Sequence, residues 1–182
     1  MREEDVIKRI LLLAVVLGTF VSTAFGAGLG NTIESISGEY GIKIQTDEIH
    51  AFGNPPRAGR LEANAAGLFG SFPDTNPNTQ QFFNGVRKLM PADAKLTASY
   101  KRYDHYLKEI YTFKSKTLAK FPNIKEAMAY QKDLGNHPVG TFFMTINYDI
   151  KHKDCVANFT IALGLPEVDI EDMKKVSKNP FK

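Results

Sequence analysis

Residues 141–165, "TFFMTINYDIKHKDCVANFTIALGL", decide the fold prediction because apolar and polar residues alternate along them. The even positions from 142 to 150 are Phe, Met, Ile, Tyr and Ile, and the odd positions from 155 to 163 are Cys, Ala, Phe, Ile and Leu. A period of two is typical of a strand that turns one face to the core. Because the chain returns at once, we predict an antiparallel hairpin.

The register of this hairpin follows from parity. Both apolar sets must lie on one face of the sheet, which requires an even number of residues in the loop. Two loops satisfy this condition, Lys153–Asp154 alone and the four residues Lys151–Asp154. A two-residue turn needs positive φ angles and favours glycine, which is absent here. We therefore predict the four-residue loop, with Ile150 opposite Cys155.

The loop also holds the best candidates for a metal or catalytic site. His152 and Cys155 are residue types that bind zinc, but no spacing in the chain supplies the remaining ligands. A second candidate pair is Glu48 and His50, which lie two apart on a predicted strand. Two groups are too few for a metal centre, so we predict a turn at 151–154, no metal site, no cofactor and no catalytic residue.

Residues 92–121 carry the strongest helical pattern in the chain. At 100° per residue, their apolar side chains fall within an arc of roughly 100°. These side chains are Leu96, Tyr100, Tyr103, Leu107, Ile110, Tyr111, Leu118 and Phe121. Shorter helices are predicted at 29–37, between Asn76 and Pro91, at 123–134 and at 167–177, and a strand is predicted at 40–50.

Together these elements predict an α+β fold. The hairpin 141–163 and the strand 40–50 form a small antiparallel sheet, which packs against the long helix (about 92–121) and the shorter helices. A chain of 182 residues suits one domain, which we place at 27–182. It includes a long loop at about 53–76, where Gly and Pro interrupt every longer pattern.

The N-terminus has the layout of a secretory signal peptide. Residues 10–26 form an apolar run after two basic residues, and Ala24 and Gly26 are the small residues expected before a cut at Ala27. We predict that the signal peptide is 1–26 and that the protein is exported, to a periplasm or the cell exterior. The alternative is an uncleaved membrane anchor formed by residues 10–26.

Charge is distributed unevenly along the chain. Residues 87–126 carry ten Lys or Arg and four Asp or Glu, whereas residues 27–86 carry three and six. On the predicted long helix, the cations opposite the apolar stripe are Lys101, Arg102, Lys108, Lys116 and Lys120. Such a face attracts an acidic protein or an anionic surface. Export and the lack of a basic–aromatic pattern disfavour nucleic acid, and a membrane is a partner only if the N-terminal segment is retained.

These observations favour an exported, non-catalytic binding or accessory module for a protein, an anionic surface or a small ligand. One alternative is a small exported enzyme, for example a metal-dependent hydrolase, that uses scattered His, Asp, Glu and Cys residues. A second alternative is a sensor domain anchored in the membrane.

Overall fold

The computed structural model describes residues 27–40, 50–64, 80–103, 107–121, 124–125, 137–148, 156–166, 174–177 and 179–181. These residues form a mostly β protein, with a six-stranded antiparallel sheet, a two-stranded sheet and short helices. The predicted α+β fold built around a long helix is therefore wrong. The longest helix in the described part of the chain has nine residues.

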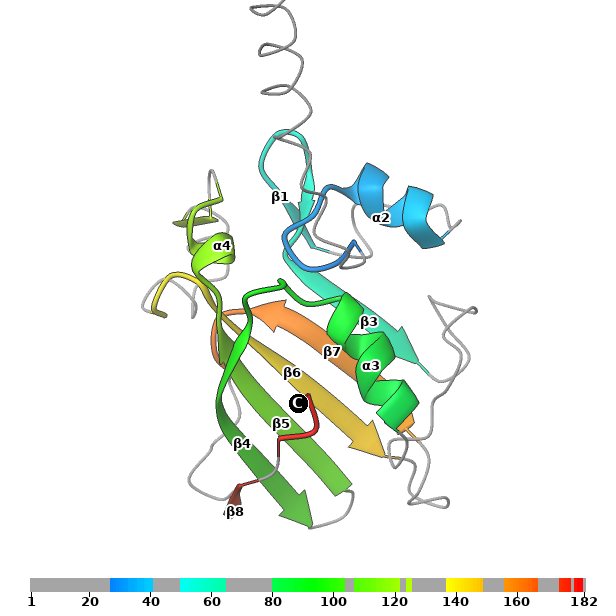
Figure 1. Cartoon of the computed structure of the whole chain (residues 1–182), viewed down its shortest axis with the longest axis vertical. Coiled ribbons are helices and arrows are strands. Elements are labelled where there is room, and N and C mark those ends of the chain that lie inside the picture. Colours follow the sequence, from blue (N-terminus) through cyan, green and yellow to red (C-terminus); the bar gives the residue numbers. More distant parts are fainter. Residues whose placement is uncertain are drawn as a thin grey trace, which may run out of the picture.

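The six-stranded sheet has the strand order β3-β7-β6-β5-β4-β8 (Figure 1). Its central strands β4 to β7 follow one another along the chain, and β3 and β8 form the two edges. The strands of this sheet are β3 (Arg60–Asn64), β4 (Lys95–Tyr103), β5 (Leu107–Lys114), β6 (Thr141–Tyr148), β7 (Val156–Leu163) and β8 (Lys174–Val176). The other elements are α2 (Ile33–Tyr40), β1 (Ala51–Phe52), β2 (Arg57–Ala58), α3 (Gln80–Lys88) and α4 (Lys116–Ala119).

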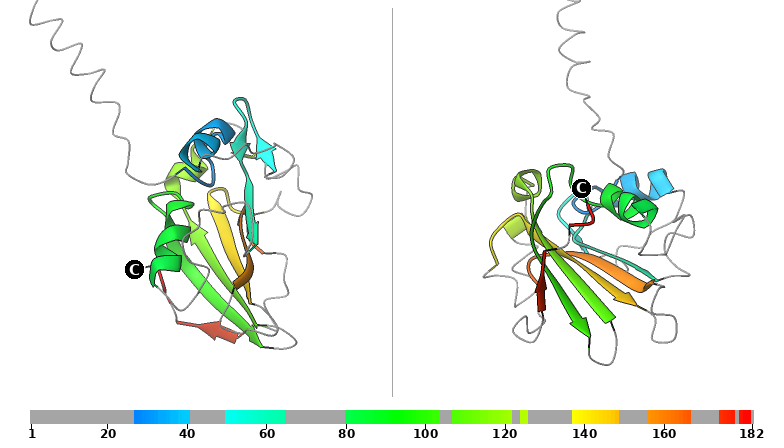
Figure 2. Two further views of the ribbon diagram at one scale, coloured as in Figure 1. Left: turned by 90° about the vertical axis from the view of Figure 1, so that its right-hand side faces the viewer. Right: turned by 60° about the horizontal axis from the view of Figure 1, so that its bottom comes forward.

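One face of the sheet is covered by α3, which lies on the same side as the described C-terminal residues (Figure 2). We call this the inner face and the opposite one the outer face. Residues paired in register share a face, and successive residues of a strand alternate between the two faces. The register therefore assigns each described strand residue to one face.

The predicted hairpin is confirmed as β6 and β7. Phe142 pairs with Leu163 and Asn147 with Asn158, which is the register set by the four-residue loop. The inner face receives Phe142, Met144, Ile146 and Tyr148 from β6, and Phe159, Ile161 and Leu163 from β7, all of them buried. A bulge then places Val156 opposite Tyr148. As a result Val156 is buried, whereas the smaller Ala157 is only partly buried. The loop itself, residues 149–155, lies outside the described residues.

The long helix predicted at 92–121 is replaced by the antiparallel pair β4 and β5, followed by the four-residue α4. Its apolar residues are divided between two faces. Tyr111 and Phe113 point inward, whereas Tyr100 and Ile110 pair on the outer face. Because apolar residues occur on both faces of these strands, their spacing in the sequence resembles that of a helix. The β-branched and aromatic content of this stretch favours strands, and here it agrees with the structure.

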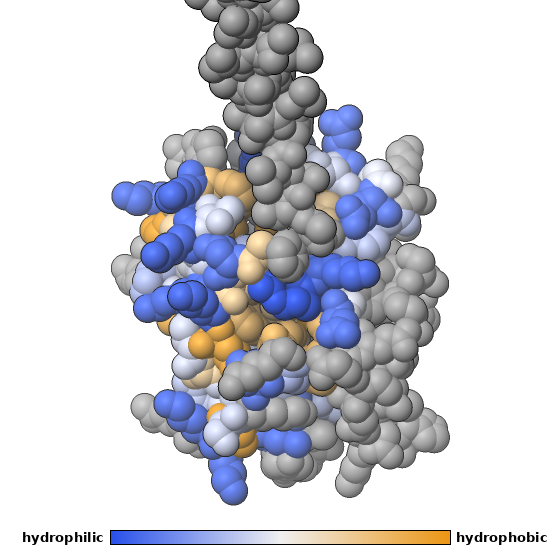
Figure 3. All heavy atoms as spheres, in the orientation of Figure 1, coloured by the Kyte–Doolittle hydropathy of each residue, from blue (hydrophilic) through white to orange (hydrophobic). Residues whose placement is uncertain are grey.

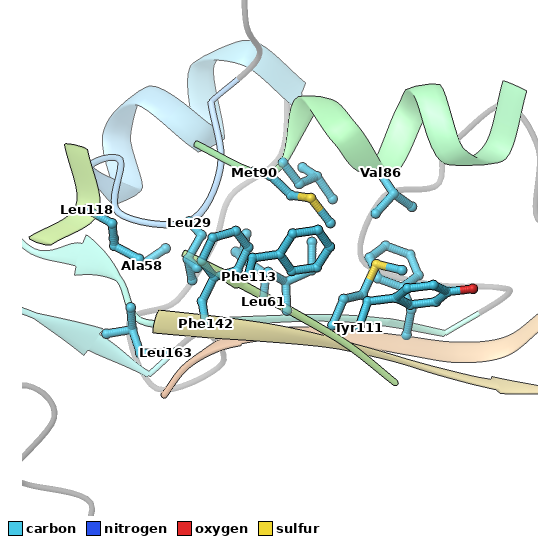
Figure 4. Packing of buried hydrophobic residues seen from close by; sticks show 14 of the residues in the cluster. Leu29, Ala58, Leu61, Val86, Met90, Tyr111, Phe113, Leu118, Phe142 and Leu163 are labelled. Atoms are coloured by element: carbon cyan, nitrogen blue, oxygen red, sulfur yellow. The ribbon is translucent and has the colours of Figure 1, made fainter. Parts of the chain in front are cut away.

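The core lies between α3 and the inner face (Figure 4). The predicted helix before Pro91 is confirmed as α3, and its stripe of Phe82, Phe83 and Val86 continues into Leu89 and Met90, all buried. Met90 and Val86 point toward the sheet, where Phe113 and Phe142 stack with ring centroids 4.9 Å apart. Such packing is the main stabilising term of the fold.

The last described residues complete this core. After β8 the chain reaches the inner face, where the Phe181 ring lies 5.3 Å from each of the rings of Phe83, Tyr111 and Phe113, in edge-on geometry. The predicted helix at 167–177 is wrong at Lys174–Val176, which form β8. Residues 167–173 lie outside the described residues.

The N-terminal part follows the predictions in part. The helix predicted at 29–37 corresponds to α2, but α2 begins only at Ile33, where Thr32 caps it, and it runs on through Gly38 to Tyr40. Leu29, Ile33 and Ile36 are buried. Tyr40 is thus helical, and the rest of the predicted strand, up to residue 49, lies outside the described residues. The Gly/Pro-rich stretch at 53–76 contains β2 and β3.

Candidate functional site

The structure separates the five cations that the helical pattern had grouped. Lys101 pairs with Glu109 on the inner face, whereas Arg102 and Lys108 pair with each other on the outer face. Lys101 and Lys108 therefore point to opposite sides of the sheet, although the helical pattern placed them side by side. Lys116 is the first residue of α4 and Lys120 caps its C-terminal end, and both side chains are exposed.

The other candidate ligands do not converge within the described chain. His50 is an exposed turn residue with φ of 41°, not a strand residue. Glu48, His152 and Cys155 lie outside the described residues. No group of three His, Cys, Asp or Glu side chains that could hold a metal ion occurs among the residues with described placement.

The outer face of β4, β5 and β8 forms a basic surface that the sequence analysis identified only in part. We define the outer basic face as Lys95, Arg102, Lys108, Lys114 and Lys175, which the register places on this side. The only carboxylate among the described residues of these three strands is Glu109, which points inward. Lys95 and Lys114 were missed because the predicted long helix put them on other sides, and Lys175 because it lies outside that helix.

Two pairs of like charges stand directly opposite each other on the outer basic face. Lys95 faces Lys114 at one end of the two strands, and Arg102 faces Lys108 about 20 Å away at the other end. Like charges at directly opposed positions destabilise a sheet. Between the two pairs, Ile110 and Thr112 are buried, so the cations form two separate groups.

In the pair Arg102 and Lys108, the charged form of one residue is disfavoured. Burial lowers the pKa of Lys108, and the neighbouring Arg102 guanidinium lowers it further. Both causes disfavour the charged ammonium group, and both would be relieved by an anion bound beside it. At this end of the outer basic face, Lys108 thus combines partial burial with a like-charged neighbour.

A second polar cluster lies on the inner face, inside the core. The Glu109 carboxylate accepts hydrogen bonds from the hydroxyls of Tyr111 and Tyr148, at 2.6 and 2.9 Å, and Lys101 Nζ lies 3.2 Å from its other oxygen. The side chain of Glu109 is 3% exposed and that of Lys101 is 23% exposed. Sequence reasoning missed this cluster, because its residues come from three strands.

The geometry of this cluster indicates a structural role. Burial raises the pKa of the Tyr111 hydroxyl, and the Glu109 carboxylate raises it further, so this tyrosine remains a hydrogen-bond donor. Both hydroxyls donate to a carboxylate that Lys101 neutralises. A buried charge is tolerated when it is paired and hydrogen-bonded in this way.

The surface above the core differs from the outer basic face. On the α3 side, hydrophilic residues lie around the rim and hydrophobic ones gather toward the centre (Figure 3). The largest helix of the described chain crosses this side, and the outer basic face lies on the far side of the sheet. The two faces are thus chemically distinct.

Asp93 fixes the junction between β5 and α4. Its carboxylate accepts hydrogen bonds from Ser115 Oγ at 2.5 Å and from the backbone amides of Lys116 and Thr117 at 2.7 and 2.9 Å. Burial by itself would raise the pKa of Asp93, but the hydrogen bonds from Ser115, Thr117 and Lys116 outweigh it and lower the pKa below its usual value.

The Asp93→Ala variant should therefore lose stability in a pH-dependent way. At neutral pH we expect a loss of about 1–2 kcal/mol, the range for a helix-capping residue. A carboxylate whose pKa is lowered by folding stabilises the fold above its unfolded pKa of about 3.9, and this contribution disappears as the pH falls through the folded pKa. Urea unfolding of both proteins at neutral and acidic pH tests this. A difference that stayed constant down to the lowest accessible pH would contradict it.

Comparisons with known proteins give no guide to the site, since no protein-family model, no curated protein and no solved structure matches this chain. None of the helices in the described segments is long and apolar enough to cross a membrane. The predicted N-terminal segment 1–26 lies outside these segments.

Proposed function

We propose that this protein is an exported, non-catalytic binding module that holds a carboxylate-rich partner on its outer basic face. The observation that carries the proposal is the pair Arg102 and Lys108, two cations at directly opposed positions of one face. Such a pair lowers the stability of the sheet. An anion that binds beside Lys108 is attracted by both cations.

Charge and position support this proposal. Five cations lie on the outer side of three adjacent strands, whose one described carboxylate points away from them. Multivalent positive surfaces attract polyanions and accelerate their association. Lys116 and Lys120, on α4 directly after β5, are two further exposed cations.

Export rests on the apolar run and the small residues that precede Ala27. Every residue that the structure describes would be retained after cleavage there. The intact mass of the exported protein tests this part of the proposal. A full-length chain in the membrane fraction would instead support the anchored alternative.

The Lys108→Glu variant tests the binding function. We expect its affinity for immobilised polyglutamate at low salt to fall at least about tenfold, a loss of about 1.4 kcal/mol. The affinity of the unaltered protein should also fall with added salt, because the Debye length shrinks from about 10 Å at 0.1 M to about 3 Å at 1 M. The stability of the variant should stay equal or rise by about 0.2–1 kcal/mol, because the change converts a like-charge pair into an opposite-charge pair.

Lys88→Glu is the matched control. Lys88 is exposed at the end of α3, which covers the other face of the sheet. The control makes the same change in net charge, so it should retain most of the affinity. Equal binding by the two variants would reject the outer basic face as the binding surface.

A further inference from the structure

The end of the outer face that carries Arg102 and Lys108 also carries asparagines on the neighbouring strands. Asn158 of β7 pairs with Asn147 of β6, which pairs with Lys108 of β5, which in turn pairs with Arg102 of β4. We call these four residues the transverse row. Neighbouring strands are about 4.8 Å apart, so the row extends over about 14 Å. Asn158 is exposed and the other three residues are half-exposed.

The transverse row is accessible, whereas its neighbours on β5 and β6 toward the middle of the outer face are not. Two residues further along β5 and β6, on the same face, the paired residues Ile110 and Thr145 are 0% and 6% exposed. The middle of the outer face is thus not open to a ligand. A ligand that contacts Lys108, Asn147 and Asn158 together lies across the strands.

The asparagines add a chemistry that cations alone do not provide. Asn147 Nδ2 donates a hydrogen bond to Asn158 Oδ1 at 2.5 Å, which orients both amides. An amide group has two N–H donors and an oxygen with two lone pairs, so each amide keeps further capacity to donate and accept. Sugar hydroxyls are the groups that need both kinds of partner at once.

We propose that the transverse row binds an acidic polysaccharide, with sugar hydroxyls on Asn147 and Asn158 and a carboxylate on Lys108. This inference rests on the proposed function and names its ligand class. A polymer of hydroxylated, carboxylated sugars complements both halves of the row. Its length lets it extend across several strands.

Other polyanions fit the row less well. An acidic peptide supplies carboxylates, but its backbone amides match the edge of a sheet rather than its face. A membrane surface requires exposed apolar side chains beside the cations. Among the described residues the only exposed large hydrophobic one is Val139, which precedes β6 and lies outside the row.

Binding of three polymers tests the inference: polygalacturonate, polyglutamate of similar length, and neutral dextran. Titration calorimetry of the exported chain at low salt should give an affinity for polygalacturonate about tenfold higher than for polyglutamate, and none for dextran. The Asn147→Ala variant should lose about five- to tenfold in affinity for polygalacturonate, as expected for one or two lost hydrogen bonds. Its affinity for polyglutamate should not change.

Asn158→Ala should likewise lose affinity for polygalacturonate and keep its affinity for polyglutamate. With two variants, a folding defect in one of them does not decide the result. Thr160→Ala is the control, because Thr160 is half-exposed on the same face of β7 but outside the row. Polyglutamate bound as tightly as polygalacturonate, or asparagine variants without effect, would overturn the polysaccharide inference and leave the proposed function standing. Failure to bind either polyanion would overturn both.

Discussion

Replacing Glu109 by alanine is expected to lower the free energy of unfolding by about 3–5 kcal/mol, the cost of breaking a buried charge pair. The carboxylate is the common acceptor for Tyr111 and Tyr148 and the partner of Lys101. Its loss leaves two buried hydroxyls without this acceptor, and a buried unsatisfied group costs about 1–3 kcal/mol. Lys101 loses less, because part of its side chain reaches solvent.

Denaturant unfolding of Glu109→Ala measures this loss of stability, and Tyr148→Phe, which removes one hydrogen bond of the same cluster, is the comparison. Tyr148→Phe removes one hydroxyl together with its hydrogen bond and should cost only about 1 kcal/mol. Both positions are buried on the inner face, so differences in exposure do not confuse the comparison. A Glu109→Ala variant no less stable than Tyr148→Phe would show that the carboxylate does not organise the cluster.

The second large effect is expected for Phe142→Ala, which should cost about 3–5 kcal/mol. Phe142 is fully buried, stacks on Phe113 and lies beneath the residues of α3. Its removal leaves a cavity in the centre of the core, which the surrounding strands cannot close without losing their register.

The adjacent residue supplies the control. Phe143 has the same side chain but points to the outer face and is half-exposed. Phe143→Ala should therefore cost less than about 1.5 kcal/mol, in proportion to the apolar area buried there. Thermal unfolding of the two variants decides the point. Equal losses would mean that the outer face is packed as tightly as the inner one.

The hairpin β6–β7 could be predicted from the sequence because its inward positions are uninterrupted apolar residues. The hairpin β4–β5 could not, because its inward positions include Ser99, Lys101 and Glu109. A strand that contributes polar residues to a buried cluster does not alternate in hydropathy, so it lacks the period of two that identifies a strand in the sequence. The polar network in this part of the core is therefore the reason why the hairpin β4–β5 could not be predicted.

The candidate site was predictable by residue type and not by arrangement. The sequence identified Arg102 and Lys108 as cations in a basic stretch, but only the register shows that they oppose each other. Asn147 and Asn158 alternate with the apolar positions of the predicted hairpin, and the register places both on the outer face. Their alignment with Lys108 depends on the pairing of β5 with β6, which no local pattern encodes. Phe181, close to the C-terminus, gave no sequence signal of its role in the core.

The position of β3 has a consequence for the order in which the chain can fold. Strands β4 to β7 pair with their neighbours in sequence, and the pairs β4–β5 and β6–β7 are each joined by fewer than ten residues. Arg60 of β3, by contrast, pairs with Ala162 of β7, roughly 100 residues later. Contacts of such high sequence separation are slow to form. During synthesis, β3 therefore waits for β7 to become available before it can join the sheet.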